Sequence, residues 1–284
     1  MIAEGCVGMS IHAGCCIIAE NQYITVQRTG MYQLVNLQGQ IDSFPWRDAV
    51  EEIGQVEQDQ FRQLKEGHQL GLAGRREEQL KELQKLAPDH ICIRSIDIRR
   101  EEAANQLDEL IGELGGMDLY LHCSGTGHQN YGLSPDIELD TLETNGTGFT
   151  RMVTAAFRYF ARQGNGHIAV ISSIAGTKGL GAAPAYSATK RFQNTYLDAL
   201  EQLACMQHLS IRFTDIRPGF VATGLLNDGK HYPMLMNTAY VARKIVSALH
   251  HRRRIAVIDW RYRIMVFFWK LIPPFVWKRL PVRN

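Results

Sequence analysis

Apolar residues follow two different periods along residues 67–260. Short apolar or alternating runs, which are typical of buried strands, cover residues 68–73, 91–96, 117–123, 167–172, 211–216 and 255–259. Apolar side chains at helical spacing lie between them, over residues 75–86, 103–114, 139–162 and 185–206. Strands that alternate with helices in this way predict an α/β fold, in which helices cover both faces of a parallel sheet.

The first 66 residues do not continue this pattern. Residues 1–39 show no stable hydrophobic period, whereas residues 47–66 are polar and compatible with a helix. We therefore expect three parts. These are an atypical N-terminal region over residues 1–66 that contains the start of the domain, an α/β domain over residues 67–260, and a C-terminal tail over residues 261–284.

Tyr186 and Lys190 lie four residues apart in one of the expected helices. This spacing places both side chains on one face, one turn apart. A cation beside a phenol favours the phenolate and lowers the pKa of the tyrosine. Such a phenol can exchange a proton with a substrate hydroxyl or carbonyl near neutral pH. Taken alone, a pair of this kind is more often a solvated helix face, so the interpretation depends on its surroundings.

Polar residues near the ends of the expected strands provide that context. Ser173 stands thirteen residues before Tyr186, at the end of one strand, and Asn145 lies in the preceding long helix in the sequence Asn-Gly-Thr-Gly. The sequence Arg-Pro-Gly-Phe-Val-Ala-Thr, residues 217–223, follows a later strand. Ligands bind at the carboxyl ends of parallel strands, so these residues are candidates for one site.

Over residues 67–260 these motifs together resemble the short-chain dehydrogenase/reductase family. The resemblance implies a doubly wound, Rossmann-like parallel sheet in three α/β/α layers. It implies that Tyr186 is the proton donor or acceptor, and that Lys190 lowers the pKa of this tyrosine and holds the nicotinamide ribose. By the same resemblance, Ser173 hydrogen-bonds the substrate oxygen and Asn145 supports a water-linked proton relay. The family also often forms dimers or tetramers through its two long helices, so we expect a homo-oligomer.

The resemblance further implies a dinucleotide site. The residues that match the family's cofactor positions, besides Tyr186 and Lys190, are Asp97, Ile98, Ser124, Gly125, Pro218, Gly219, Val221 and Thr223. Arg75 and Arg76 follow the expected strand at residues 68–73, which matches the second strand of the family. A carboxylate at the end of that strand is typical of NAD enzymes. Two guanidinium groups can clamp a 2′-phosphate, which favours NADP (NADPH). The alternative is that these two arginines simply begin an exposed helix.

One family motif is missing. The family opens with a strand and a glycine-rich turn of the form TGxxxGxG, whose glycines let the backbone approach the pyrophosphate. The glycines before Gly67 lack this spacing, and they are Gly5, Gly8, Gly14, Gly30, Gly39 and Gly54. This departure supports a second hypothesis. The chain would then be a catalytically silent protein of the same fold, with impaired dinucleotide binding, that acts as a binding or membrane-associated protein.

Composition argues against several other classes. Hydrophobic residues make up 45% and charged residues 21% of the 284 residues, as in an ordinary globular chain. The six cysteines are scattered without CxxC spacing, so neither a disulfide framework nor a metal site is expected. No apolar run is long enough to span a bilayer, and no Lys/Arg-rich start precedes an apolar run. We therefore expect a cytoplasmic protein.

The charge is concentrated at the C-terminus. Residues 252–284 contain nine Lys/Arg and one acidic residue, Asp259, although the whole chain has a net charge of only +2. Aromatic residues flanked by these cations are typical of a segment in a membrane interface, which would place the protein peripherally at the inner face of a membrane. Equally, the tail could pack as a helix over the substrate cleft or at a subunit interface. Nucleic-acid binding is not expected, because the aromatics cluster with Leu, Ile and Val.

The sequence therefore predicts an NADP-dependent oxidoreductase that interconverts an alcohol and a ketone, with a small hydrophobic substrate. The cofactor carries the hydride, and the protein supplies orientation and a tuned proton donor.

Overall fold

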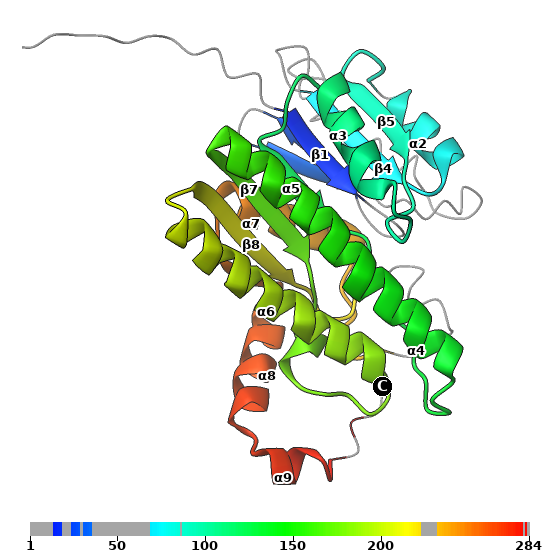
Figure 1. Cartoon of the computed structure of the whole chain (residues 1–284). Helices are drawn as coiled ribbons and strands as arrows, with labels where there is room; N and C mark the ends of the chain where they lie inside the picture. The colour runs from blue at the N-terminus through cyan, green and yellow to red at the C-terminus, as the bar shows by residue number, and fades with distance from the viewer. Residues whose placement is uncertain are drawn as a thin grey trace, which may run out of the picture.

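The computed structural model describes residues 14–18, 24–28, 31–35, 69–85, 87–222, 232–280 and 282. Its centre is a 7-stranded sheet with the order β5-β4-β1-β6-β7-β8-β9, in which each pair of neighbours is parallel. The strands are β1 (Gly14–Ile18), β4 (Gln69–Gly74), β5 (Ile91–Ser95), β6 (Leu119–His122), β7 (Asn165–Ile171), β8 (Ser210–Arg217) and β9 (Ile255–Val257). The chain order reverses beside β1, as it does in doubly wound sheets (Figure 1).

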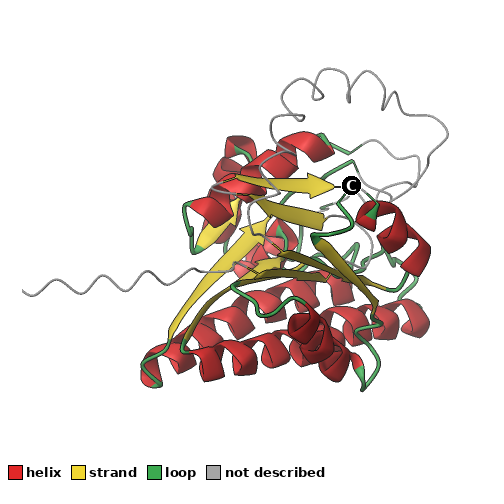
Figure 2. Cartoon of the chain, turned by 90° about the horizontal axis from the view of Figure 1, so that it is seen from above, coloured by secondary structure: helices red, strands yellow, loops and turns green. Residues whose placement is uncertain are grey.

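Helices cover both faces of this sheet, which confirms the three-layer α/β/α prediction (Figure 2). One face carries α3 (Ala103–Glu113), α5 (Phe149–Gln163) and α6 (Pro184–Met206). The other face carries α2 (Glu77–Gln84), α7 (Thr238–His250) and one side of α8 (Trp260–Leu271). Shorter elements complete the described chain: α4 (Pro135–Leu142), the π-helical turn η1 (Glu143–Gly148), the 3-10 turn η2 (Ile174–Thr177) and α9 (Pro274–Trp277).

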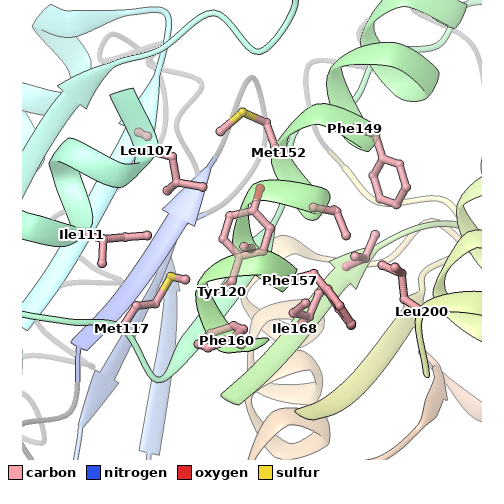
Figure 3. Close-up of a cluster of buried hydrophobic side chains, with 14 of the residues drawn as sticks. Leu107, Ile111, Met117, Tyr120, Phe149, Met152, Phe157, Phe160, Ile168 and Leu200 are labelled. Atoms are coloured by element: carbon pink, nitrogen blue, oxygen red, sulfur yellow. The ribbon is translucent and has the colours of Figure 1, made fainter. Parts of the chain in front are cut away.

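Large apolar side chains fill the layer between the sheet and α3, α5 and α6 (Figure 3). Leu107 from α3, Phe160 from α5 and Ile168 from β7 are all fully buried there. Gly166 allows the close contact, because a Cβ at this position would lie 2.1 Å from the Phe160 ring. Burying each of these large side chains stabilises the fold by roughly 1.5–3 kcal/mol, so this layer holds the strand ends in a fixed arrangement.

The N-terminal region contributes a central strand that the sequence pattern did not reveal. β1 pairs with β4 on one side and with β6 on the other. Its sequence, Gly-Cys-Cys-Ile-Ile, does not alternate, as is usual for a short strand buried on both faces, and periodicity alone cannot separate it from its surroundings. An antiparallel pair, β2 (Ile24–Arg28) with β3 (Met31–Val35), follows β1, and β3 lies alongside α7. The helix expected over residues 47–66 falls outside the described residues.

Several predicted boundaries also change. The single helix expected over residues 139–162 begins earlier, at Pro135, and is interrupted by η1 before α5 starts. The helix α7 was not predicted, although its apolar residues Val241, Ile245 and Leu249 recur at helical spacing and are buried. Within the described residues, no helix is both long enough and apolar enough to cross a membrane.

Candidate active site

The structure brings Tyr186, Ser173 and Lys190 together at the carboxyl end of the sheet. Tyr186 and Lys190 lie one turn apart on α6, and Ser173 is the second residue after β7. The Ser173 hydroxyl is hydrogen-bonded to the Tyr186 phenol. The Lys190 ammonium lies over the tyrosine ring, 5.8 Å from its centroid. Three of the side chains predicted to be catalytic are therefore neighbours.

Ser173 is held in place by the backbone around it. It caps η2, and its Oγ accepts a hydrogen bond from the backbone N–H of Ala175 at 3.1 Å. The next residue is fixed as well, since the N–H of Ile174 donates to the carbonyl oxygen of Pro218 at 3.1 Å. The serine hydroxyl is thus oriented before any substrate arrives, which is what a substrate-positioning group requires.

Lys190 is buried, with 4% of its surface exposed. Its ammonium donates to the carbonyl oxygen of Ile171 at 3.1 Å and to Oε1 of Gln193 at 3.2 Å. Burial lowers the pKa of Lys190 to about 8, against the opposing influence of Asp215 and Cys123. Near neutral pH this amine therefore carries a proton that it can lose more easily than an exposed lysine can.

The pKa of Tyr186 differs from the sequence-based expectation. Burial raises it, and the hydrogen bond from Ser173 opposes this rise. The expected lowering by Lys190 does not occur in this arrangement, since the ammonium faces the ring and donates its hydrogen bonds to other groups. Tyr186 therefore holds its proton at neutral pH and is prepared to act as a donor.

Asn145 lies in η1, and a wide turn of this kind is frequent at functional sites. Its amide nitrogen donates to the carbonyl oxygen of Thr126 at 2.6 Å, and its Oδ1 accepts from the N–H of Thr126 at 2.9 Å. The side chain of Asn145 therefore anchors the loop that follows β6. Its backbone carbonyl accepts a hydrogen bond from Nε2 of Gln193 at 3.0 Å.

Gln193 connects the predicted site residues, and sequence reasoning did not identify it. It is fully buried, accepts a hydrogen bond from Lys190 and donates one to Asn145. The available signal was its position three residues after Lys190, which places it on the same face of α6. Its partner Asn145 lies 48 residues away in the chain, so only the folded structure reveals the link.

Two glycines after β6 allow the backbone to approach the site closely. A Cβ on Gly127 would lie 2.2 Å from the Tyr186 ring, which no real contact tolerates. A Cβ on Gly125 would lie 3.2 Å from the Lys190 ammonium. Gly125 was predicted from its place in the chain, whereas Gly127 was not. Gly127 therefore requires the absence of a side chain for Tyr186 to keep its place, whereas a side chain at Gly125 would require only a small shift of Lys190.

A buried charged network supports the site from beneath. The carboxylate of Asp215 is fully buried and accepts hydrogen bonds from Arg217 Nε at 2.8 Å and from Asn194 Nδ2 at 2.9 Å. The hydroxyl of Ser172 donates to the same carboxylate. Because these four residues come from β8, α6 and the position directly after β7, the network fixes the segments that carry Ser173 and Tyr186 relative to one another.

At the β4–β5 end of the sheet lie the residues expected to hold the adenosine half of a dinucleotide. Arg75 and Arg76 are exposed directly after β4, and Ser95 Oγ donates to the Arg75 carbonyl oxygen at 3.3 Å. Asp97 is close to Arg75, whose charge lowers its pKa, but the strongest influence comes from Arg99, which brings the pKa to about 2. Arg99 Nε and Nη2 bind the two carboxylate oxygens at 3.0 and 2.8 Å.

Other predicted cofactor residues lie along the same edge with different surroundings. Ile98 is fully buried and lies close to Gly148 of η1. Ser124 is fully buried at the end of β6, and its hydroxyl has no hydrogen-bond partner among the described residues. An orphaned buried hydroxyl of this kind fits a site that receives a polar ligand group.

After β8, the predicted residues meet the tail. A Cβ on Gly219 would lie 2.2 Å from the Tyr262 ring of α8, so this glycine accommodates the tail. Pro218 accepts the Ile174 hydrogen bond, and Val221 is buried and bridges to Met236. Thr223 lies outside the described residues.

The residues present fit a nicotinamide dinucleotide at both of its ends. Arg75, Arg76 and Ser124 offer donors at one edge, and Tyr186 and Lys190, the residues expected to meet the nicotinamide ribose, lie together. The stretch that follows β1, residues 19–23, contains no glycine, and it lies outside the described residues. Among the described residues, no group of three or more His, Cys, Asp or Glu side chains could hold a metal ion.

Comparison with known proteins gives concordant results. The family model described as short chain dehydrogenase matches residues 61–232. An uncharacterised oxidoreductase of Mycobacterium tuberculosis (strain H37Rv) is 26% identical over 224 residues, which cover 75% of this chain and 88% of that protein. The NADP-dependent 3-hydroxy acid dehydrogenase YdfG of Escherichia coli (strain K12) is 28% identical over 198 residues, which cover 65% of this chain and 78% of that protein.

Solved structures share the fold. A structure described as ElxO with NADP bound has a TM-score of 0.63 and 17% identity, and the match covers 89% of this chain and 99% of that one. A putative short-chain alcohol dehydrogenase from Sinorhizobium meliloti has a TM-score of 0.62 at 18% identity, covering 72% of this chain and 90% of that one.

Proposed function

Because the chain belongs to the short chain dehydrogenase family, we propose that it is an NADP-dependent oxidoreductase that interconverts an alcohol and a ketone on a small hydrophobic substrate. The observation that carries this proposal is the convergence of Tyr186, Ser173 and Lys190 at the carboxyl end of the sheet. A tyrosine hydrogen-bonded to a pre-oriented serine and backed by a buried lysine is suited to exchanging a proton with a carbonyl oxygen.

In the direction of reduction, the Tyr186 hydroxyl donates its proton to the substrate carbonyl oxygen. The Ser173 hydroxyl donates a hydrogen bond to the same oxygen and fixes its position. When bound, the dinucleotide supplies the hydride to the carbonyl carbon. Burial keeps Tyr186 protonated at neutral pH, so the donor is loaded before the reaction. The nearby Lys190, with a pKa of about 8, can return a proton to the phenolate left behind.

The preference for NADP rests on Arg75 and Arg76, which follow β4 on the surface. Guanidinium groups there can bind a 2′-phosphate, and Asp97 nearby is already held by Arg99. The Escherichia coli relative is NADP-dependent by its name, and the ElxO structure has NADP bound. The cofactor of these two proteins agrees with our proposal for this chain.

The test of the activity is a variant that removes one oxygen. Tyr186→Phe should abolish NADPH-dependent ketone reduction and should leave NADPH binding nearly unchanged. The reduction is measured as the loss of NADPH absorbance with a panel of hydrophobic ketones. Tyr159→Phe is the matched control, since its hydroxyl contacts the backbone N–H of Met117, away from Tyr186. Turnover by Tyr186→Phe equal to that of the wild type would remove this residue from the mechanism.

The second candidate function is a catalytically silent protein that does not bind the dinucleotide. The observation in its favour is that β1 is followed by residues without a glycine, where the family has its pyrophosphate turn. Thermal unfolding with and without NADPH separates the two. Ligand at one hundred times its Kd stabilises the fold by about 2.7 kcal/mol, so the enzyme should show a higher Tm and the silent protein no change.

We also propose that the chain forms a homo-oligomer through the outer face of α6. Phe192, Leu203 and Met206 lie on one side of this helix at helical spacing and are exposed. Replacing Leu203 and Met206 by Lys should lower the molar mass measured by light scattering to that of one chain. A wild-type mass of one chain would contradict this contact.

A further inference from the structure

The helix α8 has two apolar sides, and only one of them is covered. On the inner side, Tyr262 is fully buried and Val266 is 4% exposed, and both belong to the core on the α7 face of the sheet. The Tyr262 hydroxyl accepts a hydrogen bond from the N–H of Phe220 at 3.0 Å and donates to the carbonyl oxygen of Met234 at 3.1 Å. The inner side of α8 is therefore part of the packed core.

The end of the tail is fastened to the loop that follows Ser173. Lys178 donates to the carbonyl oxygen of Ile272 at 2.8 Å, and the Trp277 indole N–H donates to the carbonyl oxygen of Gly179 at 2.8 Å. In Figure 1, α8 and α9 lie at the end of the molecule toward which β7 and β8 point. The tail is therefore a fixed part of the edge that carries the catalytic residues.

The outer side of α8 is a continuous apolar stripe. It consists of Trp260, Ile264, Phe267, Phe268 and Leu271, each between 50% and 63% exposed. The spacing, i, i+4, i+7, i+8 and i+11, places all five on one face of the helix. We call this set, with Phe275 of α9 at 60% exposure, the outer stripe. An exposed apolar surface of this kind marks a contact with a partner or a membrane.

Cations border the outer stripe on both sides. Arg261 lies along one side of the helix, and Arg263 and Lys270 lie along the other. Lys278 and Arg279 follow α9 directly. Residues 260–280 contain no Asp or Glu, and the preceding Asp259 is bound by Arg261 at 3.0 Å. Arg261 is thus paired with Asp259, whereas residues 260–280 supply no carboxylate of their own, so the stripe is an apolar surface inside a rim of net positive charge.

This charge pattern selects the kind of partner. In a twofold dimer the same patch faces itself, so the positive rims of two copies would repel each other. A nucleic acid would leave the apolar stripe without an apolar surface to pack against. A bilayer that contains anionic lipid matches both parts, since its acyl boundary accepts the aromatic and aliphatic side chains while its headgroups attract the rim.

We propose that the outer stripe docks on the surface of an anionic lipid bilayer, with α8 lying parallel to the membrane plane. Because Trp277 and Lys178 join the tail to the loop after Ser173, docking places the catalytic edge beside the bilayer. If the proposed function holds, a hydrophobic ketone or alcohol dissolved in the lipid would reach the site from that surface. The docking itself does not require the proposed function.

The test is sedimentation of the full chain with vesicles of phosphatidylcholine, with and without phosphatidylserine. We expect the wild type to sediment with the anionic vesicles and to be released by high salt, because screening weakens the attraction of the rim. The double variant Phe267→Ser, Phe268→Ser should lose about tenfold or more in partitioning, since two large apolar groups no longer enter the lipid. Leu139→Ser, which removes an exposed apolar side chain of α4, is the matched control and should sediment like the wild type.

Circular dichroism checks that the double variant stays folded, as expected because the inner side of α8 is unchanged. No vesicle binding by the wild type at low salt would overturn the proposal, and so would equal binding by the double variant. A double variant whose molar mass falls in the absence of lipid, with no vesicle binding by the wild type, would instead identify the stripe as a contact between copies. The variant Tyr186→Phe should be inactive yet sediment normally, so failure of the docking and failure of the proposed catalysis are distinguishable.

Discussion

The link through Gln193 gives the sharpest prediction about the site. In Gln193→Leu, Lys190 loses one of its two hydrogen-bond acceptors, and the Asn145 carbonyl loses its donor. A hydrogen bond to a charged group contributes about 1.5–3 kcal/mol. At neutral pH, removing the proton from an amine whose pKa is about 8 costs only about 1.4 kcal/mol. The amine should therefore lose its proton rather than remain charged without its partner.

The consequence is a shift in pH dependence. The lost hydrogen bond corresponds to about 1–2 pH units, so the pKa of Lys190 should fall from about 8 to roughly 6–7. Because the protonated amine is needed to return a proton to Tyr186, the alkaline side of the rate profile should move toward lower pH by the same amount. In contrast, Gln193→Glu places a carboxylate beside the ammonium, which should raise the pKa of Lys190. The alkaline side of the rate profile should then move toward higher pH.

The assay is the rate of NADPH-dependent ketone reduction from about pH 5.5 to about pH 9.5, with kcat and kcat/KM fitted separately. Gln202→Leu, an exposed position on the same helix, controls for a general effect of leucine on α6. A profile for Gln193→Leu that coincides with the wild type at all pH values would refute the link. A loss of activity without any shift would show that Gln193 serves only packing.

Three further predictions concern the rest of the edge and the core. Arg75→Ala should weaken NADPH by about tenfold or more, since it removes a charge-assisted contact worth about 1.5–3 kcal/mol, and should change NADH little; equal losses in fluorescence titrations would place the 2′-phosphate elsewhere. Gly127→Ala should reduce turnover by about tenfold or more, because the new Cβ would lie 2.2 Å from the Tyr186 ring and displace it; a wild-type rate would contradict this geometry. Burial lowers the pKa of His167 to about 4, with Arg252 and Arg212 adding to the effect, so below about pH 6.5 only the unfolded chain binds this proton. The free energy of unfolding should therefore fall from about pH 6.5 to about pH 4, and His167→Gln should reduce this slope by about 1.4 kcal/mol per pH unit in urea titrations.

The sequence was sufficient to predict those parts of the fold that a local pattern of residues determines. The alternation of apolar runs and helical spacing over residues 67–260 predicted the α/β/α architecture, which the sheet order confirms. Strand β1 was missed because its sequence, Gly-Cys-Cys-Ile-Ile, does not alternate and therefore carries no strand period. The fold was thus predictable except where a strand lacks a periodic pattern.

The site was predictable only in part, because some of its contacts join distant segments. Tyr186, Lys190 and Ser173 could be found from their spacing, and the structure places them together. Gln193 was not found, since its role depends on a carbonyl from another helix. The raised pKa of Tyr186 was also not predictable, because burial comes from the tertiary packing rather than from the neighbouring lysine.

The wide turn η1 decides what the Asn145 carbonyl does. In a regular α-helix this oxygen would accept the N–H of Phe149, but that N–H goes to the carbonyl oxygens of Thr144 and Gly146. The carbonyl is thereby left for Gln193. Deleting one residue of η1 would restore the regular ladder, so the helix would gain a conventional hydrogen bond while the site lost its connection to Lys190. One inserted residue, rather than any side chain, thus separates a merely structural helix from one that takes part in the site.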